Sequence, residues 1–183
     1  MFGPVYSLSG DSYPSDLHVD RELYRRLAPS FGRWTGQKDM PESIPTNDFG
    51  QRAAHFETYL AAQQSGDAAV LMGRSSGARL ATWYASRHPV AAVICFGYPF
   101  RNPAIGSEPE RYRHLAGLAV PTLIFQGVRD EYGGSNVFSD YPLSPSVRVH
   151  LLDAGHDFSL ASDAWDMICR LILEFCQEVL RRD

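Results

Sequence analysis

The chain has 183 residues, close to the usual size of one domain, and hydrophobic residues make up 44% of it. Aromatic residues at 12% supply the core that an intrinsically disordered chain lacks. The formal net charge of -4 argues against a nucleic-acid binder, which needs a concentrated basic surface.

Targeting and redox signals are weak. No stretch approaches the roughly 18 to 20 uncharged apolar residues of a membrane span. No basic residue precedes Arg21 and no long apolar run opens the chain, so no secretory signal is predicted. The 3 cysteines are an odd number without a CxxC pair, which fits a reduced protein. We therefore expect a cytoplasmic monomer or homodimer that contacts neither nucleic acid nor a membrane.

Strand-like and helix-like segments alternate in the first third of the chain. The patterns predict a strand, a helix, a short strand, a polar loop and a second helix, at residues 4–8, 16–28, 31–35, 37–45 and 47–64. Asn47 or Asp48 is expected to cap the second helix, because short polar side chains can accept from its free N–H groups.

The rest of the chain carries clearer patterns. They predict buried strands at 68–72, 90–96, 121–126 and 147–152, and helices at 76–88 and 163–181. Strands alternating with helices indicate a mainly parallel sheet covered on both faces. We therefore expect a three-layer α/β/α sandwich with about six strands, folded as a single domain over 1–183.

The most informative segment lies between a predicted buried strand and a helix, and it reads Gly73-Arg74-Ser75-Ser76-Gly77. This G-x-S-x-G pattern is typical of a nucleophile elbow, a turn so tight that only glycine fits two residues before and after the serine. Ser75 would then project from the carboxyl edge of the sheet, where the N–H groups of the following helix also point. The alternative is a glycine-bracketed turn whose serine only caps a helix.

A serine nucleophile needs a base, and the base needs an orienting acid. In a sheet of this kind the order along the chain is serine, acid, histidine, each in a loop after a strand. Asp130 follows the predicted strand at 121–126, and His156 follows the strand at 147–152. The ordered trio is a stronger signal than any of its members.

These segments together resemble the α/β hydrolases, in particular small members without a cap domain, of the dienelactone-hydrolase-like kind. The likeness covers roughly residues 67–180 and is carried by Gly73 to Gly77, Gly97-Tyr98-Pro99, Pro121 to Gly127 before Asp130, and Gly155-His156. It implies a triad of Ser75, Asp130 and His156 that cleaves a small ester, thioester or related acyl bond through an acyl-enzyme intermediate. This chemistry uses a proton relay and backbone donors, so neither a metal nor a cofactor is expected.

The same resemblance implies an oxyanion hole. One donor, the N–H of Ser76, follows directly from the elbow. In many relatives a loop after the first strand carries a His-Gly pair and supplies the second donor. Here that loop begins Leu8-Ser9-Gly10-Asp11, so the histidine is missing while Gly10 keeps the flexibility. We expect the second donor to come from Ser9 or Gly10.

Further residues are candidates for contact with the substrate. They comprise the loop after the first strand, an arginine beside the nucleophile and aromatic side chains at the same sheet edge, namely Asp11, Ser12, Arg74, Tyr98, Phe100, Tyr132 and Phe158. The aromatic residues could instead cover the rim of the core. Arg74, Arg101 and Arg129 could attract an anionic substrate or be ordinary surface charges. About two dozen residues separate 96 from 121, too few for a lid domain, so an open site is expected.

Two alternatives stay open. Gly10-Asp11-Ser12 and Asp153-Ala154-Gly155-His156 resemble the outer motifs of the Gly-Asp-Ser-Leu (SGNH) esterases, in which Ser12 would be the nucleophile with Asp153 and His156 as partners. Against this, Asn47-Asp48 lacks the glycine that usually precedes it in such enzymes. The second alternative is a hydrolase-like domain that has lost activity and serves as a binding or scaffold module.

Overall fold

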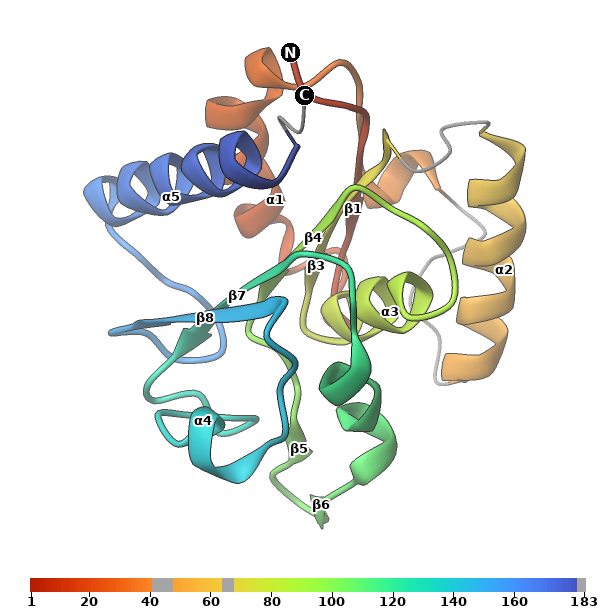
Figure 1. The fold of residues 1–183 in the computed structure, drawn as a ribbon. Coiled ribbons are helices and arrows are strands. Elements are labelled where there is room, and N and C mark those ends of the chain that lie inside the picture. Colours follow the sequence, from red (N-terminus) through yellow and green to blue (C-terminus); the bar gives the residue numbers. More distant parts are fainter. Residues whose placement is uncertain (41–47, 64–67, 181–183) are drawn as a thin grey trace.

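A computed structural model describes residues 1–40, 48–63 and 68–180 of the chain (Figure 1). Within them, six strands form one sheet in the order β2-β1-β3-β4-β7-β8, and every neighbouring pair is parallel. The strands are β1 Val5–Leu8, β2 Trp34–Thr35, β3 Val70–Arg74, β4 Ala92–Phe96, β7 Thr122–Gly127 and β8 Val147–Leu152. The predicted fold class is confirmed.

Five α-helices lie among the described residues: α1 Leu17–Leu27, α2 Phe49–Ala62, α3 Ser76–Ala85, α4 Val137–Asp140 and α5 Ser162–Leu180. The Asp48 side chain caps α2 by accepting a hydrogen bond from Gln51 N at 3.0 Å. The alternative cap, Asn47, lies outside the described residues, as do residues 41–45 of the predicted loop and the last residue of the predicted final helix. No described helix is long and apolar enough to cross a membrane.

Most predicted elements differ from the structure by one or two residues at their ends, and the strand predicted over 31–35 is only Trp34–Thr35. Two further differences have a clear cause. The helix predicted to reach His88 ends at Ala85, because Pro89 follows shortly after and Ser86 to His88 already form a turn. The strand predicted over 68–72 instead runs over 70–74, because it pairs with β1 and β4 up to the elbow. Sequence patterns also missed α4 and a small antiparallel hairpin of β5 Arg101–Asn102 and β6 Gly106–Ser107, which are too short to show periodicity.

The core has two halves, one on each face of the sheet. Helices α2 and α3 cover one face, and α1 and α5 cover the other (Figure 1). Successive residues of β3 alternate between the halves, with Leu71 packing under α3 and Val70 and Met72 packing under α1 and α5. Because side chains point to opposite faces at every step, a strand buried on both sides reads as an uninterrupted apolar run.

The carboxyl ends of the strands meet at one edge of the sheet, and backbone pairing continues past them. Ser75 N donates to Phe96 O at 2.9 Å, and Gly97 N donates to Phe125 O at 2.9 Å. Between β4 and β7 the chain forms only the β5–β6 hairpin and 3-10 helices at Pro109–Arg111 and Arg113–Gly117. The described residues 97–121 therefore contain no cap domain over this edge.

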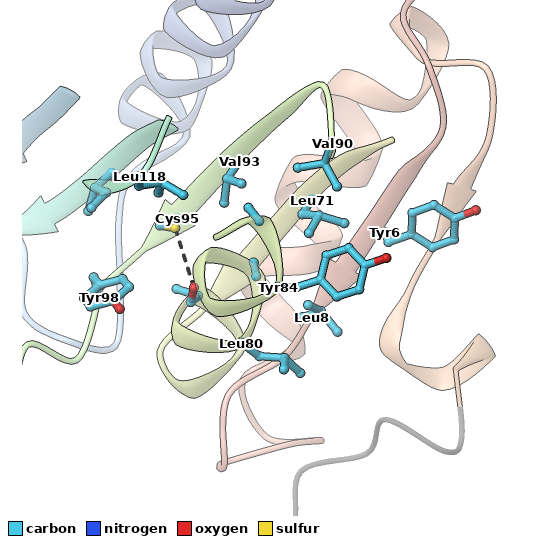
Figure 2. Close-up of a cluster of buried hydrophobic side chains, with 14 of the residues drawn as sticks. Tyr6, Leu8, Leu71, Leu80, Tyr84, Val90, Val93, Cys95, Tyr98 and Leu118 are labelled. Atoms are coloured by element: carbon cyan, nitrogen blue, oxygen red, sulfur yellow. Dashed lines mark hydrogen bonds between the residues drawn. The ribbon is translucent and has the colours of Figure 1, made fainter. Parts of the chain in front are cut away.

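The 3 cysteines are all buried and unpaired. Cys95 lies in β4 beneath α3, where its thiol donates to Ala78 O at 3.9 Å (Figure 2). Cys169 and Cys176 lie on the inner face of α5. Burial raises the pKa of all three thiols, to about 11 for Cys169 and about 12 for Cys176. They are core residues in both halves of the protein.

The half-buried His114 is expected to make the stability depend on pH. His114 Nε2 lies 2.9 Å from Thr82 Oγ1, and burial, helped by the charges of Arg79 and Arg87, lowers the pKa of His114 from 6.5 to about 4. Between these values the unfolded chain binds a proton that the folded chain excludes. Stability should therefore fall as the pH drops through this window, by about 2 kcal/mol between about pH 7.5 and 5.

The matching variant is His114→Gln, which cannot take up the proton. Urea titrations of both proteins across this pH range measure the free energy of unfolding. The free energy of unfolding of the wild type minus that of the variant should decrease toward acidic pH, because only the wild type has to exclude the proton from His114. Parallel curves for the two proteins would contradict a neutral His114 in the folded state.

Candidate active site

Ser75 lies in a strained turn between β3 and α3. Its backbone has φ 51° and ψ −120°, a conformation that L-residues rarely adopt. A Cβ on Gly73 would lie 2.5 Å from Gly77 O, and a Cβ on Gly77 would lie 2.3 Å from Leu8 O. Both contacts are with backbone atoms that cannot move independently. The spacing of the two glycines is thus required by the geometry of an elbow.

Substituting Gly77 should therefore disrupt the elbow. We expect Gly77→Ala to lower the free energy of unfolding by about 3 kcal/mol or more, because the new methyl group must displace the carbonyl groups of Leu8 and Ser9. Urea denaturation measures the change. Gly117→Ala is the control, because a Cβ there meets nothing within 4 Å. Equal stability of the two variants would contradict the close approach of β1 to the elbow.

The structure brings Ser75, His156 and Asp130 into one chain of hydrogen bonds. His156 Nε2 lies 3.0 Å from Ser75 Oγ, and His156 Nδ1 lies 2.9 Å from Asp130 Oδ2 and 3.0 Å from Oδ1. The three residues come from the loops after β3, β7 and β8, whose ends meet at the same edge. The His156 side chain is 20% exposed and the Asp130 side chain is 0% exposed. The proposed nucleophile and base can therefore be reached from solvent while the acid cannot.

Asp130 is held by one donor from the end of β7 and one from its own loop. Gln126 Nε2 donates to its Oδ2 at 2.8 Å, and Tyr132 N donates to its Oδ1 at 2.8 Å. Both oxygens also face His156 Nδ1, so a buried carboxylate finds the partners it needs. Sequence reasoning missed Gln126. The signal available was a glutamine at the end of a strand that the sequence predicts to be buried.

The loop after β1 lies against the nucleophile, but the N–H groups of Ser9 and Gly10 are not available as oxyanion donors. Ser9 N donates to Gln37 Oε1 at 3.1 Å, and Gly10 N donates to Asp16 Oδ2 at 3.0 Å. Both groups are engaged, contrary to the prediction that one of them is the second oxyanion donor. The N–H groups of Ser76 and Asp11 have no acceptor in the described parts of the chain.

A buried arginine joins this loop to the start of α3. Arg52 donates from Nη1 to Ser76 Oγ at 3.0 Å and from Nη2 to Ser9 O at 2.8 Å. Ser76 Oγ in turn donates to Asp11 Oδ1 at 2.6 Å. Burial lowers the pKa of Arg52 to about 10, while the charges of Asp11 and Asp16 act in the opposite direction, so the group stays cationic at neutral pH. Arg52 was not predicted, although a charge in the buried stripe of α2 marks it.

Residues 32–176, most of the chain, match the family described as the alpha/beta hydrolase domain. The chain belongs to the α/β hydrolase family. A search of curated protein sequences finds no match to it. The narrower likeness to dienelactone hydrolases stays a prediction.

Solved structures show the same fold in this α/β hydrolase at low sequence identity. The esterase domain of a Rhodothermus marinus protein is 17% identical with a TM-score of 0.68, over 97% of this chain and 87% of that one. Est1E from Butyrivibrio proteoclasticus is 10% identical with a TM-score of 0.72, over 99% and 89%. The thioesterase domain of the curacin biosynthetic pathway is 13% identical with a TM-score of 0.67, over 94% and 91%.

Three of the aromatic residues predicted to contact substrate lie elsewhere in the hydrolase. Tyr98, Phe100 and Phe158 are each 0% exposed and belong to the core. The Tyr98 hydroxyl donates to Arg111 O at 2.6 Å, and Phe158 packs against Phe96 with ring centroids 5.9 Å apart. These positions are corrected to the core rim, the alternative considered from the sequence. The reason is that both loops turn inward directly after their strands.

Other candidates stay at the surface of the site. Asp11 and Ser12 are exposed, and Tyr132 is half-buried. The ring of Tyr132 lies against that of His156, with centroids 4.3 Å apart, so its side chain borders the proposed base. The placement of these three is compatible with substrate contact, which remains a prediction.

All three arginines proposed to attract an anion have partners, but only Arg74 is buried, so for the exposed Arg101 and Arg129 this role stays a prediction. Arg74 is buried and bonded to Asp16, Arg129 pairs with Asp153, and Arg101 Nε donates to Glu131 O at 2.9 Å. The pairing of Asp153 with Arg129 also removes it from His156, whose Nδ1 faces Asp130 instead. The SGNH arrangement of Ser12, Asp153 and His156 is therefore not formed.

A metal site requires several ligating side chains close together. Among the residues that the structure describes, no three or more His, Cys, Asp or Glu side chains gather as a metal site would require. The expectation of a metal-independent and cofactor-independent reaction stays a prediction.

Proposed function

We propose that this α/β hydrolase is a serine hydrolase that cleaves a small ester, thioester or related acyl bond. The observation that carries the proposal is the hydrogen bond of 3.0 Å between His156 Nε2 and Ser75 Oγ, on a residue with the strained backbone of an elbow. A serine that merely caps a helix has no reason to meet a histidine that is itself oriented by a buried carboxylate.

The reaction runs through an acyl-enzyme. Ser75 Oγ attacks the acyl carbonyl while His156 Nε2 takes its proton, and Asp130 holds the Nδ1–H and stabilises the imidazolium. The tetrahedral intermediate collapses when His156 returns the proton to the leaving alcohol or thiol. Water, activated by the same histidine, then attacks the acyl-enzyme, and Ser75 leaves with the proton. Each proton therefore moves between Ser75, water or the leaving group and His156 Nε2.

The negative oxygen of the intermediate needs donors that are not otherwise engaged. The Ser76 N–H at the start of α3 supplies one. Since the N–H groups of Ser9 and Gly10 are occupied, we assign the second to Asp11 N, the next along the loop. The bond from Ser76 Oγ to Asp11 Oδ1 joins the two residues that would supply these donors.

The acyl substrate class is supported by two features. Exposed Asp11 is bonded to Ser76 beside the nucleophile, and the described segment after β4 holds only a short hairpin and two 3-10 helices, so the site is open and suits small substrates. The solved structures with the same fold include an esterase domain and a thioesterase domain. We infer the same bond class for this chain.

The test is turnover of p-nitrophenyl acetate, butyrate and octanoate, beside labelling with a fluorophosphonate probe. We expect hydrolysis that is fastest for the short acyl chains, and one adduct per folded molecule. Folded protein that shows neither turnover nor an adduct would favour the inactive binding module.

A further inference from the structure

A second arginine, Arg74, precedes the nucleophile in the chain, and its side chain is directed to Asp16 and the histidine loop. Its side chain is 10% exposed. Nη2 donates to His156 O at 3.1 Å, and Nη1 lies 3.3 Å from Asp16 Oδ2. One guanidinium therefore contacts the histidine loop from its position on the elbow.

The partner carboxylate connects to a third loop. Asp16 is the residue before α1, and its side chain is 3% exposed. The same Oδ2 that faces Arg74 accepts the N–H of Gly10 at 3.0 Å. The pair thus bridges the elbow, the histidine loop and the loop that begins at Ser9.

The packing around Gly10 shows how tightly the pair and the nucleophile are joined. A Cβ on Gly10 would lie 2.9 Å from Asp16 Oδ2, 3.0 Å from Arg74 Nη1 and 3.0 Å from Ser75 Cβ. Both partners of the ion pair and the carbon that carries the nucleophilic oxygen therefore border the same small space beside Gly10. A displacement of Arg74 or Asp16 should therefore move Ser75 or the backbone around Gly10.

We propose that Arg74 and Asp16 are a positioning pair that holds the histidine loop and the Ser9–Ser12 loop against the elbow. The inference rests on the proposed function, because the pair would fix the distance from Ser75 Oγ to His156 Nε2 and the direction of the oxyanion donors. Neither residue touches the substrate.

Arginine suits this role better than lysine. Its planar fork can bond to a carboxylate and a carbonyl at once in fixed directions, whereas an ammonium is a point charge on a flexible stem. Both charges are buried, so loss of either one leaves the other without its partner in a poorly solvated place. The arrangement is therefore sensitive to single substitutions.

The decisive comparison is Arg74→Met with Arg26→Met. Arg26 also pairs with an acidic residue of the α1 region and is 11% exposed, but it ties α1 to Asp166 of α5, away from the site. We expect Arg74→Met to lower kcat by about 10- to 100-fold, since a misplacement of about 1 Å costs about 10²-fold. KM should stay within about threefold, and Arg26→Met should keep the wild-type kcat.

Two milder variants keep the test valid if Arg74→Met does not fold. Arg74→Lys retains the charge and Asp16→Asn retains an acceptor for Gly10 N, so each should fold and show a smaller loss of kcat. Their effects should not add in the double variant, because both act through one contact. The proposal would be overturned if the kcat of Arg74→Met were within about twofold of the kcat of Arg26→Met. It would also be overturned if the kcat of both milder variants were within that range.

Hydrogen exchange separates this inference from the proposed function. In Arg74→Met the backbone amides of 9–13 and 155–158 should exchange faster than in Arg26→Met, whether or not the protein turns over an ester. Unchanged exchange in both segments would also overturn the positioning role. If wild type neither hydrolyses esters nor takes the probe, the proposed function fails, and exchange alone decides whether the pair holds the loops.

Discussion

Ser75→Ala should abolish both ester turnover and labelling by a fluorophosphonate. Removing the hydroxyl removes formation of the acyl-enzyme, so kcat should fall by about 10⁴- to 10⁶-fold, to the level left by the oxyanion donors and binding alone. The fold should persist, because the half-buried side chain contributes little packing. Turnover of p-nitrophenyl butyrate and mass mapping of the probe adduct measure the two effects.

Ser12→Ala is the matched control, because Ser12 is exposed in the neighbouring loop. It should lower turnover by at most about 10²- to 10³-fold, the range of an oxyanion-loop residue, and leave the adduct on Ser75. An adduct mapped to Ser12, with Ser75→Ala still active, would contradict the assignment of the nucleophile.

His156→Ala should lower kcat by a comparable amount. Without the imidazole nothing accepts the proton of Ser75 Oγ, which lies 3.0 Å from Nε2, so the serine stays a weak nucleophile. Labelling by the fluorophosphonate should slow in parallel, because it needs the same activated oxygen. Stopped-flow or steady-state assays of kcat, with circular dichroism to verify folding, measure the loss.

The control for this variant is His18→Ala. His18 Nε2 bonds to Asp157 O at 2.7 Å, so its removal also disturbs the histidine loop but leaves the base in place. Activity should stay within about tenfold of wild type. Equal losses in the two variants would mean that loop order, and not proton transfer, explains the effect of His156.

The sequence was most informative where local pattern and backbone geometry coincide. The strand predicted at 147–152 has the same bounds in the structure, because its residues show a strand pattern. The elbow could be predicted because only glycine fits at Gly73 and Gly77. The meeting of Ser75, Asp130 and His156 could be predicted because each follows a parallel strand and the ends of these strands share one edge.

Contacts between distant segments could not be predicted in this way. Arg74 and Asp16 are 58 residues apart, and neither lies in a pattern that indicates its partner. Tyr98 and Phe100 were expected near the substrate because they follow a strand, yet a loop residue can turn toward either the solvent or the core. Arg52 was the exception that could have been found, since it shares the inner face of α2 with Phe56 and Leu60.

Because the three cysteines are buried, the rate at which each is alkylated reports local unfolding around it. A thiol with a raised pKa inside a core does not react with iodoacetamide until the surrounding layer separates. Cys95 samples the half beneath α3, whereas Cys169 and Cys176 sample the contact of α5 with the opposite face. Equal alkylation rates at all three cysteines would indicate that the two halves of the core open together. Faster alkylation of Cys169 and Cys176 would indicate that α5 separates from the sheet first.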